Sequence, residues 1–415
     1  MAISLTDPPT LPDLSDPSTF NSRALALFQW LRDNHIPELE AIDSDDLGGA
    51  LQTQGDVLDD LNTLGAATAA AQFLVSTAAG AFAYQSGGAA RDSLGVGLMS
   101  GFRNKIINGN FDVWQEGTSF TADGYTADQW KLTEGSGAAC TVSRQAFTLG
   151  QTDVPGNPKF FARWARGTAG SAASTFEQPM EDVRTLAGET TTETVWLKAS
   201  AATEIDIDLV QNFGTGGSPS SEVETSVVSG ASLTTSWQKF TYSVSVPSIS
   251  GKTVGSDSND YLSLKLTRAH DATNPTASVD IARVSAVQGD ATGETDPHEP
   301  RPHWLEEQFC KRYFERLGPL EYLPGFWNSG TQLLVIAKMA VTKRADPSLS
   351  YNGTLGDYTT QAQTATITGI SLSGGATNER VALVDVTCSA SSAATADGGA
   401  LFIGASGSID LDARL

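Results

Sequence analysis

Alternating apolar and polar residues dominate the middle of this 415-residue chain. The pattern recurs in TVWLKAS, TEIDIDLVQ, QKFTYSVSV, DYLSLKLTR and ASVDIARVSAV, and loops rich in Gly, Ser, Thr and Asp separate these segments. A two-residue period is typical of β-strands that bury one face. In EIDIDLV, the isoleucines and the leucine should face a core, whereas Asp206 and Asp208 should face solvent. Several such strands at close spacing predict a jelly-roll β-sandwich over residues 102–293.

The N-terminal region has a different character. Residues 1–17 are rich in Pro and Asp, and STFNSRALALFQWLRDN then has the apolar periodicity of an amphipathic helix. We predict that residues 1–45 form an acidic docking segment with a short helix. A helical cap on the following segment is the alternative. The apolar face that would dock comprises Phe20, Leu27, Phe28 and Leu31.

Residues 46–101 predict a helical stalk. Four leucines have a heptad-like spacing over about two heptads, and the Ala-rich run LGAATAAAQFLVSTAAGAFAY follows them. A single helix with so little apolar bulk is marginal in water, whereas a parallel bundle of three chains would bury it. We therefore predict a short trimeric stalk with its seam at Leu47, Leu51, Leu58 and Leu61.

The alternation stops after residue 293. ETDPHEPRPH predicts a Pro-rich linker, and WLEEQFCKRYFERLG predicts a short helix, so that the two together span 294–318. Strand-like segments return in TQLLVIAKMAV, TATITGISLS, RVALVDVTCSAS and GALFIGASGSIDLDARL, which predict a smaller β domain over 319–415. The predicted fold is therefore mainly β, with an N-terminal helical stalk, a jelly-roll domain and a C-terminal β tip.

Composition and charge exclude several classes of protein. The formal net charge is −22, and basic residues form only short runs such as Lys311-Arg312, which argues against nucleic-acid binding. No window approaches the ~18 uninterrupted apolar residues of a membrane span, so we expect no membrane insertion. The N-terminus lacks the basic and apolar regions of a signal peptide. We therefore expect synthesis in a cytoplasm and exit by another route, such as lysis.

The sequence contains no recognisable catalytic or metal-binding motif. GxSxG, HExxH and GxxxxGK[ST] are absent, and a metal at His298 and His303 would need two more ligands. The three cysteines are isolated, which favours buried free thiols. We expect a protein that is not an enzyme and that has no cofactor. The loop GSDSND (255–260) could hold calcium, but a solvated turn is the favoured interpretation.

Four motifs in a fixed order resemble those of a phage and prophage tail-fibre family. They are RNKIINGNFDVWQEGTSF…GYTADQW, STFEQPMEDVRTLAGETTTETVWLKAS, SWQKFTYSVSVPSISGKTVGSDSNDYLSLKL and EPRPHWLEEQFCKRYFERLG, and together they span residues 103–318. The first β domain is also similar in layout to the jelly rolls of carbohydrate-binding modules, whose opening strand likewise runs into an N-G-N-F sequence.

The resemblance implies a homotrimeric fibre in the virion, assembled from chains made in the host cytoplasm. Its N-terminus would be held by baseplate or tail-tip proteins, and its C-terminal tip would meet host polysaccharide or lipopolysaccharide. Attachment to the host is therefore the predicted function. Two alternatives remain, namely a tail-associated depolymerase or esterase that uses the sandwich for targeting, and a structural fibre that carries a separate tip protein.

Aromatic residues of the predicted tip are the candidate receptor-binding residues. Aromatic rings stack on the C–H faces of sugars, while Asp and Asn side chains hydrogen-bond to their hydroxyls. LPGFWNSG and YNGTLGDY place such residues beside turns. The alternative is that the aromatic residues of LPGFWNSG pack along the trimer axis. The candidates are Phe326, Trp327, Asn328, Tyr351, Asp357 and Tyr358.

The first motif and the second also carry predictions about packing. Gly109 indicates a bulge or a close approach of two backbones. Trp114 and Trp130 should lie in or beside the core rather than serve as sugar platforms. Pro179 should end its strand at an edge of the sheet, because proline cannot donate a hydrogen bond to a neighbouring strand.

Overall fold

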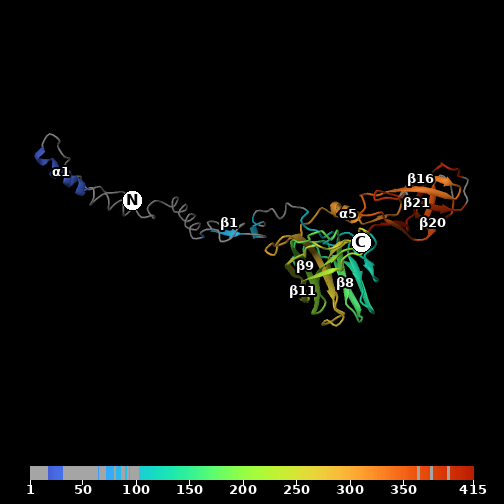
Figure 1. Cartoon of the computed structure of the whole chain (residues 1–415), viewed down its shortest axis with the longest axis horizontal. Coiled ribbons are helices and arrows are strands. Elements are labelled where there is room, and N and C mark those ends of the chain that lie inside the picture. The colour runs from blue at the N-terminus through green and yellow to red at the C-terminus, as the bar shows by residue number, and fades with distance from the viewer. Residues whose placement is uncertain are drawn as a thin grey trace. The chain divides into compact units, whose positions relative to one another are not determined.

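The computed structural model describes residues 17–30, 64, 72–78, 81–85, 89–90, 93, 102–361, 365–373, 377–389 and 393–415. The chain divides into two compact units, Met1–Ser86 and Gly87–Leu415 (Figure 1). Over these described ranges, no helix is both long and apolar enough to span a bilayer.

The first unit contains a helix and a β-hairpin. Helix α1 (Pro17–Trp30) confirms the predicted amphipathic helix. Strands β1 (Phe73–Ala78) and β2 (Ala81–Gln85) then pair antiparallel, so the helical prediction for residues 46–101 is wrong here. The reason is local, since FLVST and AFAYQ contain the β-branched and aromatic residues that favour strands.

The structure does not test the predicted docking face or the trimeric stalk. Of the docking residues, Leu27 is half-buried, the side chains of Phe20 and Phe28 lie outside the described set, and Leu31 lies beyond it. The stalk leucines are also outside the described residues, and they are Leu47, Leu51, Leu58 and Leu61.

The second unit begins with the predicted β-sandwich, which has two six-stranded antiparallel sheets. The first sheet has the order β11 (Val223–Leu233), β10 (Thr203–Asn212), β13 (Tyr261–Arg268), β8 (Ser174–Glu181), β5 (Lys131–Thr133) and β4 (Gly124–Tyr125). The second sheet has the order β12 (Gln238–Ser245), β9 (Thr190–Ala199), β14 (Val279–Gln288), β7 (Phe160–Ala169), β6 (Ala138–Ala146) and β3 (Ser119–Phe120).

The core of the sandwich lies between these sheets and is centred on aromatic rings. The ring of Trp130 lies 5.0 Å from that of Phe111 and 5.1 Å from that of Phe176, measured between centroids. Trp130 is fully buried and Trp114 nearly so, which confirms their predicted place in the core. The three cysteines are free and buried, as predicted.

Close packing of the opening segment, residues 102–118, explains Gly109. A Cβ atom at this position would lie 2.2 Å from the carbonyl oxygen of Val284, so only glycine fits. Beside it, the carboxamide of Gln178 accepts a hydrogen bond from the Ile107 amide (2.7 Å) and donates one to the Ile107 carbonyl (2.5 Å). The side chain of Gln178 thus takes the place of a neighbouring strand.

The prediction that Pro179 lies at a sheet edge is wrong, because β8 is an interior strand between β13 and β5. Strand β8 continues past Pro179 to Glu181. Proline is tolerated because β5 pairs only with the stretch from Thr175 to Glu177. At Pro179 the side of the strand that faces β5 has no ladder to interrupt.

The predicted helix over residues 304–318 is also shorter than expected. Helix α5 (His303–Lys311) ends early, and β15 (Phe314–Leu317) follows it and pairs with β23. Pairing with a distant strand overrides the local helical pattern. The Pro-rich segment before the helix is held against the sandwich, because Arg103 donates to Glu294 (2.7 Å) and Glu299 (3.1 Å).

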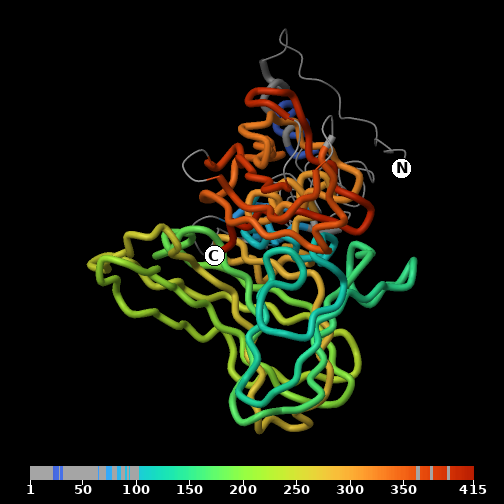
Figure 2. Tube along the Cα trace, turned by 90° about the vertical axis from the view of Figure 1, so that its right-hand side faces the viewer, coloured from blue at the N-terminus to red at the C-terminus, as the bar shows by residue number. Residues whose placement is uncertain are grey.

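The C-terminal residues form a second, smaller sandwich. Its six-stranded sheet has the order β19 (Tyr358–Gln361), β22 (Gly398–Ile403), β16 (Tyr322–Ser329), β17 (Gln332–Lys338), β21 (Val381–Cys388) and β20 (Ile367–Leu372). Its three-stranded sheet has the order β15, β23 (Ser408–Asp412) and β18 (Ser348–Asn352). These strands form their own group in Figure 2, in orange to red, and enclose a separate core.

Candidate functional site

The outer face of the first sheet carries a continuous line of polar side chains. Cross-strand partners share one face of a sheet, and the register pairs Asp208 with Lys265, Lys265 with Glu177, Glu177 with Lys131, and Lys131 with Tyr125. Residues next to these along the strands, such as Leu209, Leu264 and Phe176, point into the core instead. We call these five residues the cross-strand row; it spans strands β10, β13, β8, β5 and β4.

Charges alternate along the cross-strand row and hydrogen bonds hold its centre. The hydroxyl of Ser263, which is fully buried, donates to Glu177 Oε2 at 3.0 Å. The ammonium of Lys265 lies 2.9 Å from a carboxylate oxygen of the exposed Glu224. Lys131, Glu177 and Lys265 remain half-buried, so their polar groups lie at the boundary between protein and water.

Asp208 lies on the predicted face but not in the predicted environment. Only 6% of this residue is exposed. Burial raises the pKa of its carboxyl to about 6, and the nearby negative charge of Glu224 adds to the effect while Lys265 opposes it. The expectation of a fully solvated Asp208 is therefore wrong, because neighbouring strands on both sides crowd an interior strand.

A polar cavity of about 300 Å³ opens on the first sheet. It is lined in part by Asp206, Thr267 and Asp271, and Asp206 is the cross-strand partner of Thr267. The carboxylate of Asp206 accepts hydrogen bonds from the Gly230 amide (2.7 Å) and the Ser229 hydroxyl (3.1 Å). Since Asp206 and Asp208 share a face of β10, the cavity lies next to the cross-strand row.

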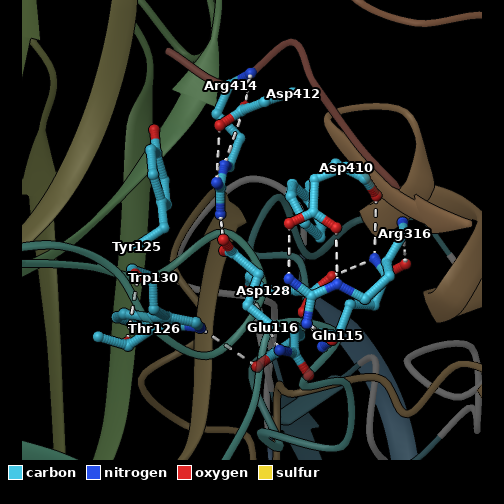
Figure 3. Close-up of polar contacts among 12 residues, drawn as sticks. Gln115, Glu116, Tyr125, Thr126, Asp128, Trp130, Arg316, Asp410, Asp412 and Arg414 are labelled. Atoms are coloured by element: carbon cyan, nitrogen blue, oxygen red, sulfur yellow. Dashed lines mark hydrogen bonds and ion pairs between the residues drawn. The ribbon is translucent and has the colours of Figure 1, made fainter. Parts of the chain in front are cut away.

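The C-terminal arm, residues 408–415, lies against the other end of the cross-strand row, at Tyr125 (Figure 3). The guanidinium of Arg414 lies 4.3 Å from the ring centroid of Tyr125 and pairs with the carboxylates of Asp412 (2.7 Å) and Glu116. The Tyr125 hydroxyl donates to the carbonyl oxygen of Leu415 at 2.6 Å. The orientation of Tyr125 is therefore fixed by residues nearly 300 positions away in the sequence.

Further contacts join the arm's strand to the sandwich, as Figure 3 also shows. Arg316 makes two hydrogen bonds of 2.6 Å to Asp410, and its Nη1 donates to the Gln115 carbonyl at 3.1 Å. The Gln115 side chain donates to the Phe314 carbonyl (2.9 Å) and to Asp128 (2.5 Å). Burial raises the pKa of Asp128. These contacts tie the C-terminal sandwich to the first one.

The structure separates the predicted receptor-binding residues. Trp327 is completely buried, and Tyr358 is buried with its hydroxyl within hydrogen-bond distance of the carbonyl oxygens of Asn352 (2.6 Å) and Ser408 (2.7 Å). The prediction that these two side chains meet a receptor is wrong, because alternation along β16 and β19 turns both into the core.

The remaining predicted residues keep some exposure but lie on different elements. Phe326 and Asn328 are exposed on β16, Tyr351 is exposed on β18 of the other sheet, and Asp357 is half-buried. The Asp357 carboxylate accepts a hydrogen bond from the amide of Thr354 at 2.6 Å, so it stabilises a turn. The structure does not bring the six residues into one site.

The suggested calcium loop uses its polar atoms internally. Asp257 accepts a hydrogen bond from the Thr215 hydroxyl (2.8 Å), and the side-chain oxygen Oδ1 of Asn259 accepts one from the Thr215 amide (2.8 Å). Among the residues that the structure describes, no group of three or more His, Cys, Asp and Glu side chains is arranged to hold a metal ion.

Sequence reasoning missed the cross-strand row. Its residues lie in four segments of sequence, and two of them, Asp208 and Lys265, belong to strands whose alternation was visible. Alternation reports which residues share a face within one strand, but only the register between strands places Lys265 beside Glu177.

No protein-family model and no curated protein matches the sequence. Among solved structures, a carbohydrate-binding module described as CBM4 is 18% identical, covers 44% of this chain and 99% of its own, and gives a TM-score of 0.28. The enzymatically active domain of tailspike protein 4 of bacteriophage CBA120 is 13% identical, covers 46% of this chain and 22% of its own, and gives a TM-score of 0.28.

A third similar structure is the CBM22-2 xylan-binding domain of Xyn10C from Paenibacillus barcinonensis. It is 14% identical, covers 41% of this chain and 99% of its own, and gives a TM-score of 0.28. At these low sequence identities and TM-scores, the similar structures do not show that the chain belongs to a family. Its mainly β, jelly-roll-like architecture is shown by its own strand order and register.

Proposed function

We propose that this chain attaches a phage particle to its host, and that its first sandwich binds a surface glycan without cleaving it. The observation that supports glycan binding is the cross-strand row, whose charged and hydroxyl groups lie at a face bordered by a polar cavity of about 300 Å³. A site for a hydrated polymer needs this kind of polar, partly open surface rather than an enclosed apolar pocket.

The side chains of the row match the chemistry of sugars. Sugar hydroxyls both donate and accept hydrogen bonds, so a site needs donors and acceptors side by side. Lys131 and Lys265 are donors, and Glu177 between them is an acceptor. Tyr261, on the same face, adds a ring for stacking. Burial raises the pKa of Tyr261 to about 12, and the nearby negative charge of Glu177 adds to the effect. The Tyr261 hydroxyl therefore remains a donor at physiological pH.

The tail-fibre part of the proposal is supported by the four ordered motifs between residues 103 and 318. Their resemblance implies a homotrimer in the virion, assembled in the host cytoplasm and held at the baseplate by its N-terminus. It also implies polysaccharide or lipopolysaccharide as the receptor. Three weak sites acting together would raise the avidity for a repetitive polymer without new contacts.

Binding of purified full-length protein to polysaccharide from candidate hosts tests the proposal. We expect binding that falls at least about tenfold in Lys131→Ala and Glu177→Gln, because each removes a hydrogen-bonding group of the row. Lys252→Ala, in an exposed turn, is the matched control and should bind normally. Wild-type affinity in both row variants, with melting temperatures unchanged, would place binding elsewhere.

A polysaccharide depolymerase is the second candidate. Asp208 has a pKa raised to about 6 and lies near Glu224, and glycosidases pair a carboxyl of raised pKa with a second carboxylate. New reducing ends after incubation with host polysaccharide, lost in Asp208→Asn, would establish cleavage and refute binding without turnover. Intact polymer bound by the wild type would exclude the depolymerase.

A further inference from the structure

A patch of aromatic and basic side chains lies on the outer face of the second sheet, on the opposite side of the sandwich from the cross-strand row. Ala162, Trp164 and Leu197 point into the core, so alternation places their neighbours along β7 and β9 on the outer face. Residues just after β6 and just before β12 complete the patch. Its members, which we call the aromatic–basic patch, are Phe147, Phe161, Arg163, Lys198 and Trp237.

The three rings of the aromatic–basic patch pack against one another. The ring centroid of Phe147 lies 4.8 Å from that of Phe161 and 5.4 Å from that of Trp237. The rings of Phe161 and Trp237 are 5.5 Å apart and almost perpendicular. Phe161 is buried with Val154 and Ala282 and forms the floor, whereas Phe147 and Trp237 are half-buried. The patch therefore offers part of two aromatic rings to the C–H groups of a ligand.

Two cations border these rings and share one carboxylate. Asp280 is the cross-strand partner of both Arg163 and Lys198. Arg163 donates to its two oxygens at 2.7 and 2.9 Å, and the Lys198 ammonium lies 3.6 Å away from it. The same ammonium lies 5.1 Å from the ring centroid of Trp237, within range of a cation–π contact. The Asp280 side chain is only 4% exposed, against 39% for Arg163 and 29% for Lys198, so the surface presents mainly positive charge.

The aromatic–basic patch has hydrogen-bond donors to spare. Within the part of the chain that the structure describes, Arg163 Nη1, Lys198 Nζ and Trp237 Nε1 make no hydrogen bond. The indole nitrogen of Trp237 also reaches the surface. Both oxygens of Asp280 already accept hydrogen bonds from Arg163. A carboxylate only accepts hydrogen bonds, and its two oxygens can bind several N–H groups at once. The patch therefore suits a ligand that has a carboxylate beside an apolar C–H face.

We propose that the aromatic–basic patch is a second glycan site, which binds an acidic sugar of a polysaccharide. The carboxylate of the sugar lies between Arg163 and Lys198, and its C–H face packs on Trp237. The chain has a net charge of −22, but charges more than about 8 Å away are largely screened at physiological ionic strength. The two cations and one carboxylate at the patch leave a local excess of one positive charge. The inference concerns the second sheet, so it holds whether or not the cross-strand row binds sugar.

Single-stranded nucleic acid is the alternative ligand, because its bases also stack on aromatic rings. Proteins that bind it line a groove with basic residues, since every nucleotide carries a phosphate. The aromatic–basic patch has two cations, and both already contact Asp280. It can therefore hold one anionic group but not a continuous row of phosphates, which favours the acidic sugar.

Binding of the full-length protein to acidic polymers provides the first test. The probes are polygalacturonate, alginate, hyaluronate and polysialic acid, and we expect at least one of them to bind. Methyl esterification of its carboxylates, which removes the charge and keeps the sugar ring, should weaken binding at least about tenfold. Raising sodium chloride from about 0.05 to about 0.5 M should also weaken it. Oligothymidylate, the probe for nucleic acid, should bind at least about tenfold more weakly than the acidic polymer.

Substitutions assign this binding to the patch. Lys198→Gln and Trp237→Ala should each weaken it at least about tenfold, and Lys198→Arg should retain it. Lys252→Gln is the matched control for the charge, because Lys252 also lies over a ring, 5.6 Å from the centroid of Phe213, but outside the patch. Trp304→Ala removes an exposed indole elsewhere. Both controls should bind as the wild type does. Lys198 is at the surface, so Lys198→Gln should keep the wild-type melting temperature even if Trp237→Ala does not.

Several outcomes would overturn the inference. They are binding to none of the four polymers, binding that survives esterification, and wild-type affinity in Lys198→Gln. Tighter binding of oligothymidylate than of every acidic polymer, lost in Trp237→Ala, would assign the patch to nucleic acid. Lys131→Ala separates this site from the cross-strand row. It should leave acidic-polymer binding unchanged, and a loss in Lys131→Ala without a loss in Lys198→Gln would place the acidic sugar on the row.

Discussion

Glu193 places a carboxyl group inside the core of the first sandwich, and its ionisation should make the stability of that domain depend on pH. It lies on β9 and points to the same side as Val195 and Leu197, which are core residues. The Thr191 hydroxyl donates to one carboxyl oxygen at 2.9 Å, and the other oxygen is buried with no hydrogen-bond partner. Burial raises the pKa of Glu193 from 4.5 to about 8.

The sign and size of the pH dependence follow from the difference between the pKa of Glu193 in the unfolded chain and in the folded protein. Between pH 4.5 and 8 the native state keeps a proton that the unfolded chain has released, so the free energy of unfolding falls as pH rises. The slope is about 1.4 kcal/mol per pH unit and vanishes above pH 8. From pH 6 to pH 9 the wild type should therefore lose about 3 kcal/mol through this group.

Glu193→Gln removes the titrating group while keeping its shape. Urea unfolding between pH 6 and pH 9, followed by tryptophan fluorescence, should show a stability that falls in the wild type and is nearly flat in the variant. Glu189→Gln, the same substitution at an exposed position, should follow the wild type. A wild-type stability independent of pH over this range, or an equal loss in Glu193→Gln, would refute the assignment of a buried, protonated carboxyl.

Three further substitutions test other parts of the structure. Gly109→Ala should cost about 2–4 kcal/mol and lower the melting temperature, because its Cβ would lie 2.2 Å from the Val284 carbonyl oxygen; an unchanged melting temperature would contradict this close approach. Arg414→Gln should speed hydrogen exchange in residues 408–415, since Glu116 loses its partner; unchanged exchange would show that the arm is held by other contacts. Asp208→Asn should stabilise the protein by about 1–2 kcal/mol above pH 6, where the wild-type carboxyl is charged and desolvated, and by little at pH 4; equal gains at both pH values would exclude ionisation as the cause.

The alternation of residues along single strands was sufficient to predict the mainly β fold and much of the core. Burial of one strand face is a local property, so EIDIDLV could be oriented before its neighbours were known. The buried places of Trp130 and of the three cysteines were also predicted correctly, from the apolar character of these side chains and the isolation of the cysteines in the sequence. Gly109 was predicted to mark a bulge or a close approach of two backbones, and the structure shows the close approach.

Predictions failed where a partner elsewhere in the chain decides the structure. Residues 314–317 have a helical pattern but pair with β23 almost one hundred positions later. Trp327 stands beside a turn in the sequence, yet the side from which the three-stranded sheet covers β16 places it in the core. The hairpin at residues 73–85 shows the same limit, because an alanine-rich run favours a helix until its strand-forming residues pair.

The sequence by itself determined that this chain would form β-sandwiches with apolar cores, because apolar and polar residues alternate along each strand. Only the tertiary structure decided which polar residues meet. The register across five strands assembles the cross-strand row, and the return of the chain end brings Leu415 onto Tyr125. The physical reason is that strand register and sheet coverage depend on pairing between distant segments, and no single segment encodes them.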